Sequence, residues 1–322
     1  MSEPSAPSSS APPSSAPLSS TSAADRVART WIDFWFEPAS PQPLAAVRIL
    51  AGLLGLALAA SYSGSLVAWF GPDGMIPSDA VASWRPRVSF SPLDAVTTTT
   101  GLWLFFGGLV VALAAVTVGV ASRVACVMAA ILWAALLNRG PMLAGPADDC
   151  LAVILWCLAV GPSGNAWSID RLLRDRRGLP PPPPSPWART SLGLLRVHAA
   201  AITVGVVLAQ LKGDIWWNGT AAWWLAAAAE PAVVDLTGLY RRSEYLVNLV
   251  THGVVAFEIL YLAGLWFDAS RQIVCRMGLV AWPLIGVLAG EPFWGLAMAI
   301  FGVPWALGQA TPVAAGLPSA DD

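Results

Sequence analysis

The amino-acid sequence predicts an all-α polytopic membrane protein with about eight transmembrane helices and additional interfacial helices. Charged residues make up 12% of the 322 residues and hydrophobic residues 56%, whereas a typical globular domain has about 25% charged residues. Several windows of about 20 residues are nearly free of charge, which is long enough to cross about 30 Å of hydrocarbon as a helix. These windows predict a lipid bilayer as the partner. Because the sequence has no run of basic residues that could follow a phosphate backbone, we expect no nucleic-acid partner.

The N-terminal region divides into two segments. Residues 1–24 consist mainly of Ser, Pro and Ala and are too poor in apolar groups to fold, so we expect a disordered tail, with a second one at 311–322. Residues 25–36 place Trp and Phe beside Arg and predict a helix lying in the membrane interface. A single transmembrane domain is expected from 25 to 310.

Eight apolar stretches are the predicted spans: 44–62, 99–119, 122–138, 147–162, 191–211, 243–266, 271–289 and 292–309. The last two are joined tightly at Gly290-Glu291-Pro292, so a re-entrant segment is the alternative for one of them. A Pro-rich linker at 163–190, with a polyproline spacer at 178–187, separates two four-span halves. The outer segment 213–242 is expected to form a short helix with Trp223 and Trp224 in the aromatic belt.

Positive charge is distributed unequally between the two sides. Most arginines fall in the N-terminal segment, the linker 163–190 and the turn after the sixth span, so the positive-inside rule places both termini in the cytoplasm. Arginine greatly outnumbers the single lysine, which is typical of a GC-rich bacterial genome. We therefore expect a multi-pass protein of the plasma membrane, specifically a bacterial inner membrane.

Motifs for metal or nucleotide chemistry are not found in the sequence. The four cysteines lie in or at the ends of apolar spans without CxxC spacing, which predicts small core residues and no metal site. Zinc motifs, Gly-rich phosphate loops and nucleophile elbows do not occur.

The segment from residue 196 to 220 is the predicted centre of function. Its apolar helix carries Arg196, His198 and Gln210 and is followed by Lys212 and Trp216. A charged side chain inside a bilayer costs at least about 2.5 kcal/mol and usually faces the protein interior or a water-filled cavity. We therefore expect these residues to line an outward-facing cavity.

Helical spacing predicts which of these polar groups share a face. Arg196 and Gln210 are fourteen residues apart and lie on one face, as do Thr251 and Glu258, which are seven apart. His252 points about 120° away from Glu258. Since a carboxylate in hydrocarbon needs a partner, we expect a buried contact between Arg196 and Glu258.

Three further charged residues have alternative interpretations. Arg48 lies near the start of the first span and is interpreted as an arginine whose side chain extends to the inner interface. Asp148 and Asp149 open the fourth span, where acids complement the helix dipole. In the alternative interpretation they line the outer mouth of the cavity.

Several stretches resemble, in the same order, the transmembrane module shared by vitamin K-dependent γ-glutamyl carboxylases and bacterial membrane proteins of the HTTM family. They are spread over residues 30 to 305: Phe36-Glu37-Pro38 with Leu44, Arg48 and Gly52; Gly71-Pro72-Asp73-Gly74 with Pro77; Trp167-Ser168-Ile169-Asp170; Leu195-Arg196, Gln210-Leu211-Lys212-Gly213 and Trp216 to Ala221; His252-Gly253 with Glu258; and Phe267-Asp268-Ala269-Ser270-Arg271. The resemblance implies a short bacterial form without the soluble domain of the carboxylases.

The sequence departs from the carboxylase pattern at the positions that carry the chemistry. The family's lysine, taken to be the base that deprotonates reduced vitamin K, aligns with Gln210, which cannot accept a proton near neutral pH. The regions of two family histidines read Ala281-Trp282-Pro283 and Ala147-Asp148.

Three functions follow as hypotheses. The first is a non-carboxylase membrane protein that binds a lipid, a quinone-like molecule or a peptide in an outward-facing cavity, with peptide maturation as the role suggested by short relatives. The second is a carboxylase-like enzyme that uses reduced vitamin K or another quinone, with Lys212 as the base and His252 and Glu258 as further catalytic candidates. The third, a transporter, lacks a detectable internal repeat.

Overall fold

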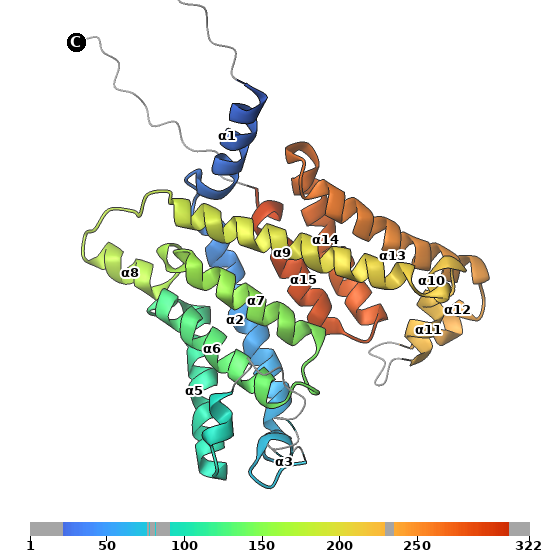
Figure 1. Cartoon of the computed structure of the whole chain (residues 1–322), viewed down its shortest axis with the longest axis horizontal. Helices are drawn as coiled ribbons and strands as arrows, with labels where there is room; N and C mark the ends of the chain where they lie inside the picture. Colours follow the sequence, from blue (N-terminus) through green and yellow to red (C-terminus); the bar gives the residue numbers. More distant parts are fainter. Residues whose placement is uncertain (1–21, 76, 78–80, 82–90, 229–234, 309–322) are drawn as a thin grey trace, which may run out of the picture.

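The protein is a bundle of helices (Figure 1). The computed structural model describes residues 22–75, 77, 81, 91–228 and 235–308. Six of the helices are long and apolar enough to cross a membrane: α2 (Gln42–Ser63), α5 (Thr99–Val118), α6 (Ser122–Arg139), α9 (Pro186–Leu211), α13 (Glu244–Gly264) and α14 (Asp268–Leu288). The all-α polytopic class is thereby confirmed, and these six coincide with predicted spans. The predicted tails at 1–24 and 311–322 fall outside the described residues, apart from residues 22–24.

The other two predicted spans form shorter helices. α7 (Pro146–Val160) and α15 (Pro292–Ala306) have 15 residues each, or about 22 Å at 1.5 Å per residue, which is less than the thickness of a typical hydrocarbon core. Twelve residues of α15 are buried, and α15 contacts α2, α7, α9 and α14. It is a central packing helix.

One hydrophobic core joins the two four-span halves. It extends from Leu44 in α2 to Ala306 in α15 and includes residues of every long helix; α13 contributes Tyr261, and α14 contributes Cys275 and Trp282. α14 and α15 pack closely, and a Cβ built on Gly286 would lie 2.8 Å from the Cα of Gly295. Small residues at this crossing allow the two backbones to touch, as is common in membrane helix pairs.

Short helices lie at both ends of the bundle. α1 (Ala23–Phe36) precedes α2 and α8 (Ile169–Arg176) precedes α9, and the starts of α2 and α9 lie together, since Ala39 pairs with Ser185; we call this end the α1 side. α3 (Leu66–Phe70) and α10 (Asp214–Trp217) follow the other ends of α2 and α9, which we call the α3 side, and Figure 1 shows α3 at the bottom of the view and α10 at its right. Also at the α3 side are α11 (Ala221–Ala228) and α12 (Thr237–Tyr240). α1 has no buried residue, as expected of an interfacial helix. Two 3₁₀ turns, η1 (Pro92–Ala95) and η2 (Ser163–Asn165), complete the described elements.

Arg48 connects the turns on the α1 side from inside the protein. Its side chain is completely buried; Nη1 donates to Ser122 Oγ at 3.2 Å and Nη2 to the carbonyl of Trp167 at 2.6 Å. Asp170 accepts hydrogen bonds from the backbone N–H groups of Ala121 and Ser122, each at 2.8 Å. We call these five residues the Arg48–Asp170 clamp. The side chain therefore does not extend out of the protein, because the turns offer it acceptors inside.

Candidate functional site

The polar residues singled out in the sequence lie in three separate places. Gln210 and Lys212 lie at the α3-side end of α9, Trp216 follows on α10, and His252 and Glu258 lie on the neighbouring part of α13. Arg196 and His198 lie further toward the α1 side on α9. Asp148 and Asp149 lie in the first turn of α7. The single cavity expected from the sequence is therefore not formed by all of them.

Gln210 and Glu258 form a buried pair between α9 and α13. Gln210 Nε2 donates to Glu258 Oε1 at 3.1 Å, and the residues are 7% and 0% exposed. Their other side-chain oxygens, Gln210 Oε1 and Glu258 Oε2, are buried with no hydrogen-bond partner in the described part of the chain. Thr251 is buried on the same face as Glu258, as the helical spacing predicts.

Arg196 does not contact Glu258, so the predicted contact was wrong. Fourteen residues separate Arg196 from Gln210 on α9, a distance of about 21 Å along the helix. The Arg196 guanidinium instead lies 4.6 Å from the ring centroid of Phe34, 5.9 Å from that of Trp266 and 5.6 Å from that of Trp305. Three aromatic rings surround the cation, and Gln210 supplies the hydrogen bond to Glu258.

The remaining candidates near α9 do not converge on Glu258. Lys212 is the C-cap of α9 and is exposed. His252 is also exposed, and its Nδ1 lies 2.9 Å from the carbonyl of Asn248. His198 makes the corresponding backbone contact with Leu194 at 2.8 Å, and Trp216 packs in a small cluster with α11 and α13. Lys212 is thus not buried by the protein.

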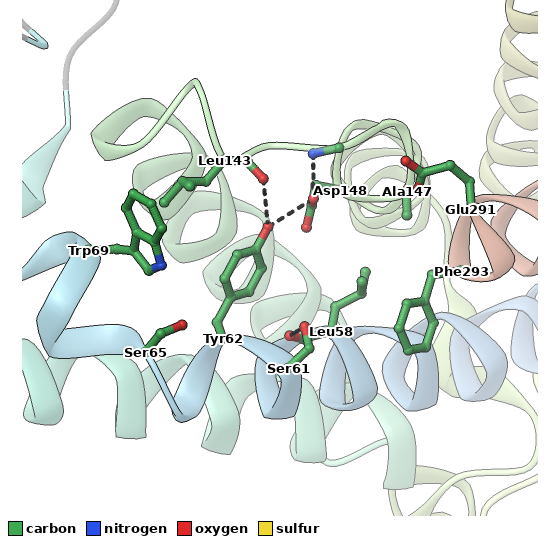
Figure 2. A pocket seen from close by; sticks show the side chains of 11 residues that line it. Leu58, Ser61, Tyr62, Ser65, Trp69, Leu143, Ala147, Asp148, Glu291 and Phe293 are labelled. Atoms are coloured by element: carbon green, nitrogen blue, oxygen red, sulfur yellow. Dashed lines mark hydrogen bonds between the residues drawn. The ribbon is translucent and has the colours of Figure 1, made fainter. Parts of the chain in front are cut away.

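A pocket of about 370 Å³ opens on the α3 side, between α2, α7 and the α14–α15 turn (Figure 2). We call it the outer pocket. Its lining consists of Leu58, Ser61, Tyr62, Ser65, Trp69, Leu143, Gly145, Ala147, Asp148, Glu291 and Phe293. Two carboxylates and no basic side chain belong to this lining, so the outer pocket is acidic.

Asp148 is held in a fixed position at the wall of the outer pocket. Its Oδ2 accepts hydrogen bonds from the backbone N–H of Gly145 at 2.7 Å and from the Tyr62 hydroxyl at 2.9 Å. Trp133 Nε1 donates to the carbonyl of Asp148 at 3.2 Å. Figure 2 shows the carboxylate reaching toward the space between Tyr62 and Phe293.

One carboxylate oxygen of Asp148 is left without a partner. Asp148 is 4% exposed, and its Oδ1 has no hydrogen-bond partner in the described ranges. A buried acceptor without a donor costs about 1–3 kcal/mol. Asp149, in contrast, is exposed and does not line the outer pocket.

An apolar groove adjoins the outer pocket. It has a volume of about 310 Å³ and lies between α2, α14 and α15. Phe293 lines both the groove and the outer pocket, and Ala57 in the groove directly precedes Leu58 in the pocket. An elongated ligand that enters the outer pocket therefore meets an apolar surface on the same side of α2.

Sequence reasoning missed several residues of the outer pocket. Tyr62 and Asp148 are 86 positions apart, and Glu291 comes from the opposite half of the chain, so no local spacing connects them. The one available signal was Glu291 itself, an acid between two apolar spans.

Searches against protein-family models, curated proteins and solved structures return no match to this chain. No group of three His, Cys, Asp or Glu side chains suited to a metal ion occurs among the described residues. The four cysteines are free and buried, as the sequence predicted.

Proposed function

We propose that this protein is a non-catalytic membrane protein that binds a lipid with an ammonium headgroup in the outer pocket. The observation that carries the proposal is the buried Oδ1 of Asp148, which has no hydrogen-bond partner among the described residues, in a pocket that a second acid, Glu291, also lines. An ionised carboxylate only accepts hydrogen bonds, so its complement is a donor, and a cationic donor also offsets the charge. The carbonyl oxygens of an oxidised quinone are acceptors and do not fit.

The surroundings of Asp148 support a lipid rather than a soluble amine. Trp69 and Phe293 present aromatic rings at the outer pocket, which favour an ammonium group through cation–π attraction. The adjoining groove is lined by apolar residues of α2, α14 and α15 and suits an acyl chain. An aminophospholipid such as phosphatidylethanolamine combines both parts.

The carboxylase-like alternative has less support. It rests on the resemblance to the HTTM family, which we retain as a hypothesis about ancestry. Gln210, at the position of the family's lysine, cannot act as a base, and Lys212 is exposed. These residues do not fit reduced vitamin K as a cofactor, and we derive no reaction step through it.

The proposal is tested by native mass spectrometry of the full chain purified in mild detergent. Phosphatidylethanolamine should be retained by the wild type and lost, by about tenfold, in Asp148→Asn, because a charge-assisted hydrogen bond contributes about 1.5–3 kcal/mol. Asp149→Asn is the matched control, since it removes the neighbouring charge outside the outer pocket. Equal retention in the two variants would refute the proposal, and retention of a peptide instead would change the ligand class.

A further inference from the structure

Arg196 has a buried charge with no ion-pair partner in the described part of the chain. It is 5% exposed, its Nε is buried without a hydrogen-bond partner, and no carboxylate lies within ion-pair distance among the described residues. The three aromatic rings around it contribute cation–π attraction but accept no conventional hydrogen bond. A buried ion without such partners is costly, which points to a ligand.

Arg196 lines the largest of the pockets we describe. This pocket has a volume of about 810 Å³ and lies on the α1 side, between α1, α9 and the α13–α14 turn. We call it the arginine pocket. It is separate from the outer pocket and shares no lining residue with it.

The arginine pocket carries a surplus of positive charge. Four arginines and two aspartates line it: Arg26, Arg189, Arg196, Arg271, Asp33 and Asp268. Two of the arginines are already engaged, because Arg189 pairs with Glu37 at 3.1 Å and Arg271 with Asp268 at 2.7 Å. Arg26 and Arg196 remain without a carboxylate partner in the described part of the chain. Two guanidinium groups that face one pocket are suited to a phosphate.

We propose that the arginine pocket binds the headgroup of an anionic phospholipid, with its phosphate between Arg196 and Arg26. The aromatic side chains of Trp31, Phe34, Trp35 and Trp266 form much of the remaining wall. An inorganic phosphate ion does not need these rings or a pocket of this size, whereas glycerol and the upper acyl chains of a lipid fill them.

The position of α1 supports a lipid as the occupant. Val27 is 70% exposed and Trp31 63% exposed, although both also line the arginine pocket. An amphipathic helix with exposed apolar residues lies at the boundary of headgroups and acyl chains, which is the depth at which a lipid phosphate is found. The bound lipid then bridges α1 to α9 and the α13–α14 turn.

Binding is tested with the full chain in detergent, using phosphatidylglycerol as the probe and the number of retained lipids in native mass spectrometry as the readout. Arg26→Gln alters an exposed side chain and should fold normally, and we expect about tenfold weaker retention. Arg196→Gln should have at least the same effect. Arg29→Gln is the matched control, since it removes the same charge from α1 but outside the arginine pocket.

Each other outcome contradicts a defined part of the inference. Equal losses in Arg26→Gln and Arg29→Gln would show attraction to surface charge only. Equal retention of phosphatidylcholine would exclude selection for an anionic headgroup, and displacement by millimolar inorganic phosphate would identify a site for a free anion. Asp148→Asn should leave phosphatidylglycerol binding unchanged, which separates this inference from the proposed function of the outer pocket.

Discussion

At the scale of single residues, the Arg48–Asp170 clamp holds backbone that is intrinsically unfavourable. Ala121 and Trp167 have φ angles of 44° and 45°, in the left-handed region that costs a residue with a side chain about 1–3 kcal/mol. Both belong to the clamp: the N–H of Ala121 donates to Asp170, and the carbonyl of Trp167 accepts from Arg48. The hydrogen bonds therefore offset the strain of two turns on the α1 side.

Asp170 also accepts a hydrogen bond from the Ser122 hydroxyl at 2.8 Å, which makes three with the two backbone N–H groups. Asp170→Asn should lower the free energy of unfolding by about 2 kcal/mol, because an amide cannot replace a carboxylate that accepts three hydrogen bonds. Burial opposes ionisation of Asp170, but hydrogen bonds from Ser122 and Ala121 and the charge of Arg48 outweigh it and lower the pKa of this carboxyl. A lowered folded-state pKa gives stability that is present above about pH 4 and lost as the pH falls further. Thermal unfolding in detergent between pH 3 and 7 measures both effects.

Asp175→Asn is the control for this prediction. Asp175 lies on the same short helix and pairs with Arg171 at 2.7 Å on the surface, where such i,i+4 pairs contribute only about 0.3–0.5 kcal/mol. The clamp would be the wrong explanation if the two variants lost equal stability, or if Asp170→Asn kept the acid dependence of the wild type.

Gln210 and Glu258 show how far the sequence alone could predict the site. Helical periodicity placed Gln210 on the face of Arg196 and Glu258 on the face of Thr251, and all four are buried, because periodicity depends only on the chain within one helix. Periodicity could not predict whether Gln210 or Arg196 is the partner of Glu258, because that depends on the position of α9 along its axis relative to α13. The same limit applies to Asp148, whose neighbours come from distant segments.

At the scale of helices, hydropathy predicted the spans but not their roles. α2, α5, α6, α9, α13 and α14 have the expected length, since a bilayer imposes a minimum apolar stretch. α15 is equally apolar but short and almost wholly buried, and a helix surrounded by protein has the same composition as one surrounded by lipid. The glycine contact with α14 identifies α15 as a packing helix.

Gly295→Ala should destabilise the bundle by about 1–3 kcal/mol, as overpacking does in well-packed interiors. A Cβ at this position would lie 2.5 Å from the carbonyl oxygen of Trp282 and 3.0 Å from Gly286 Cα, so α14 and α15 must separate. Gly205→Ala on α9 is the matched control, because nothing lies within 4 Å of its Cβ position and Ala favours a helix. Thermal unfolding should show a loss for the first variant and none for the second; equal behaviour would contradict the close contact.

At the scale of the whole molecule, the two ends of the bundle differ in chemistry. The arginine pocket and the arginine-rich helix α8 are on the α1 side, whereas the acidic outer pocket is on the α3 side. α1 and the end of α15 also lie on one side, since Arg196 contacts Phe34 and Trp305. This asymmetry matches the positive-inside rule if the α1 side is cytoplasmic, and each pocket then faces a different leaflet.

The orientation can be measured with single cysteines, because the four native cysteines are buried and give little background. Leu179 in the linker after α8 is 44% exposed and Leu239 in α12 is 53% exposed, so each can be replaced by a cysteine. The two positions lie on opposite sides of the bundle. In spheroplasts, a membrane-impermeant maleimide should label Leu239→Cys at once and Leu179→Cys only after the membrane is permeabilised. The reverse pattern would invert the topology and place the arginine pocket in the outer leaflet. Labelling of both without permeabilisation would mean that α9, the candidate span between them in the described chain, does not cross the bilayer.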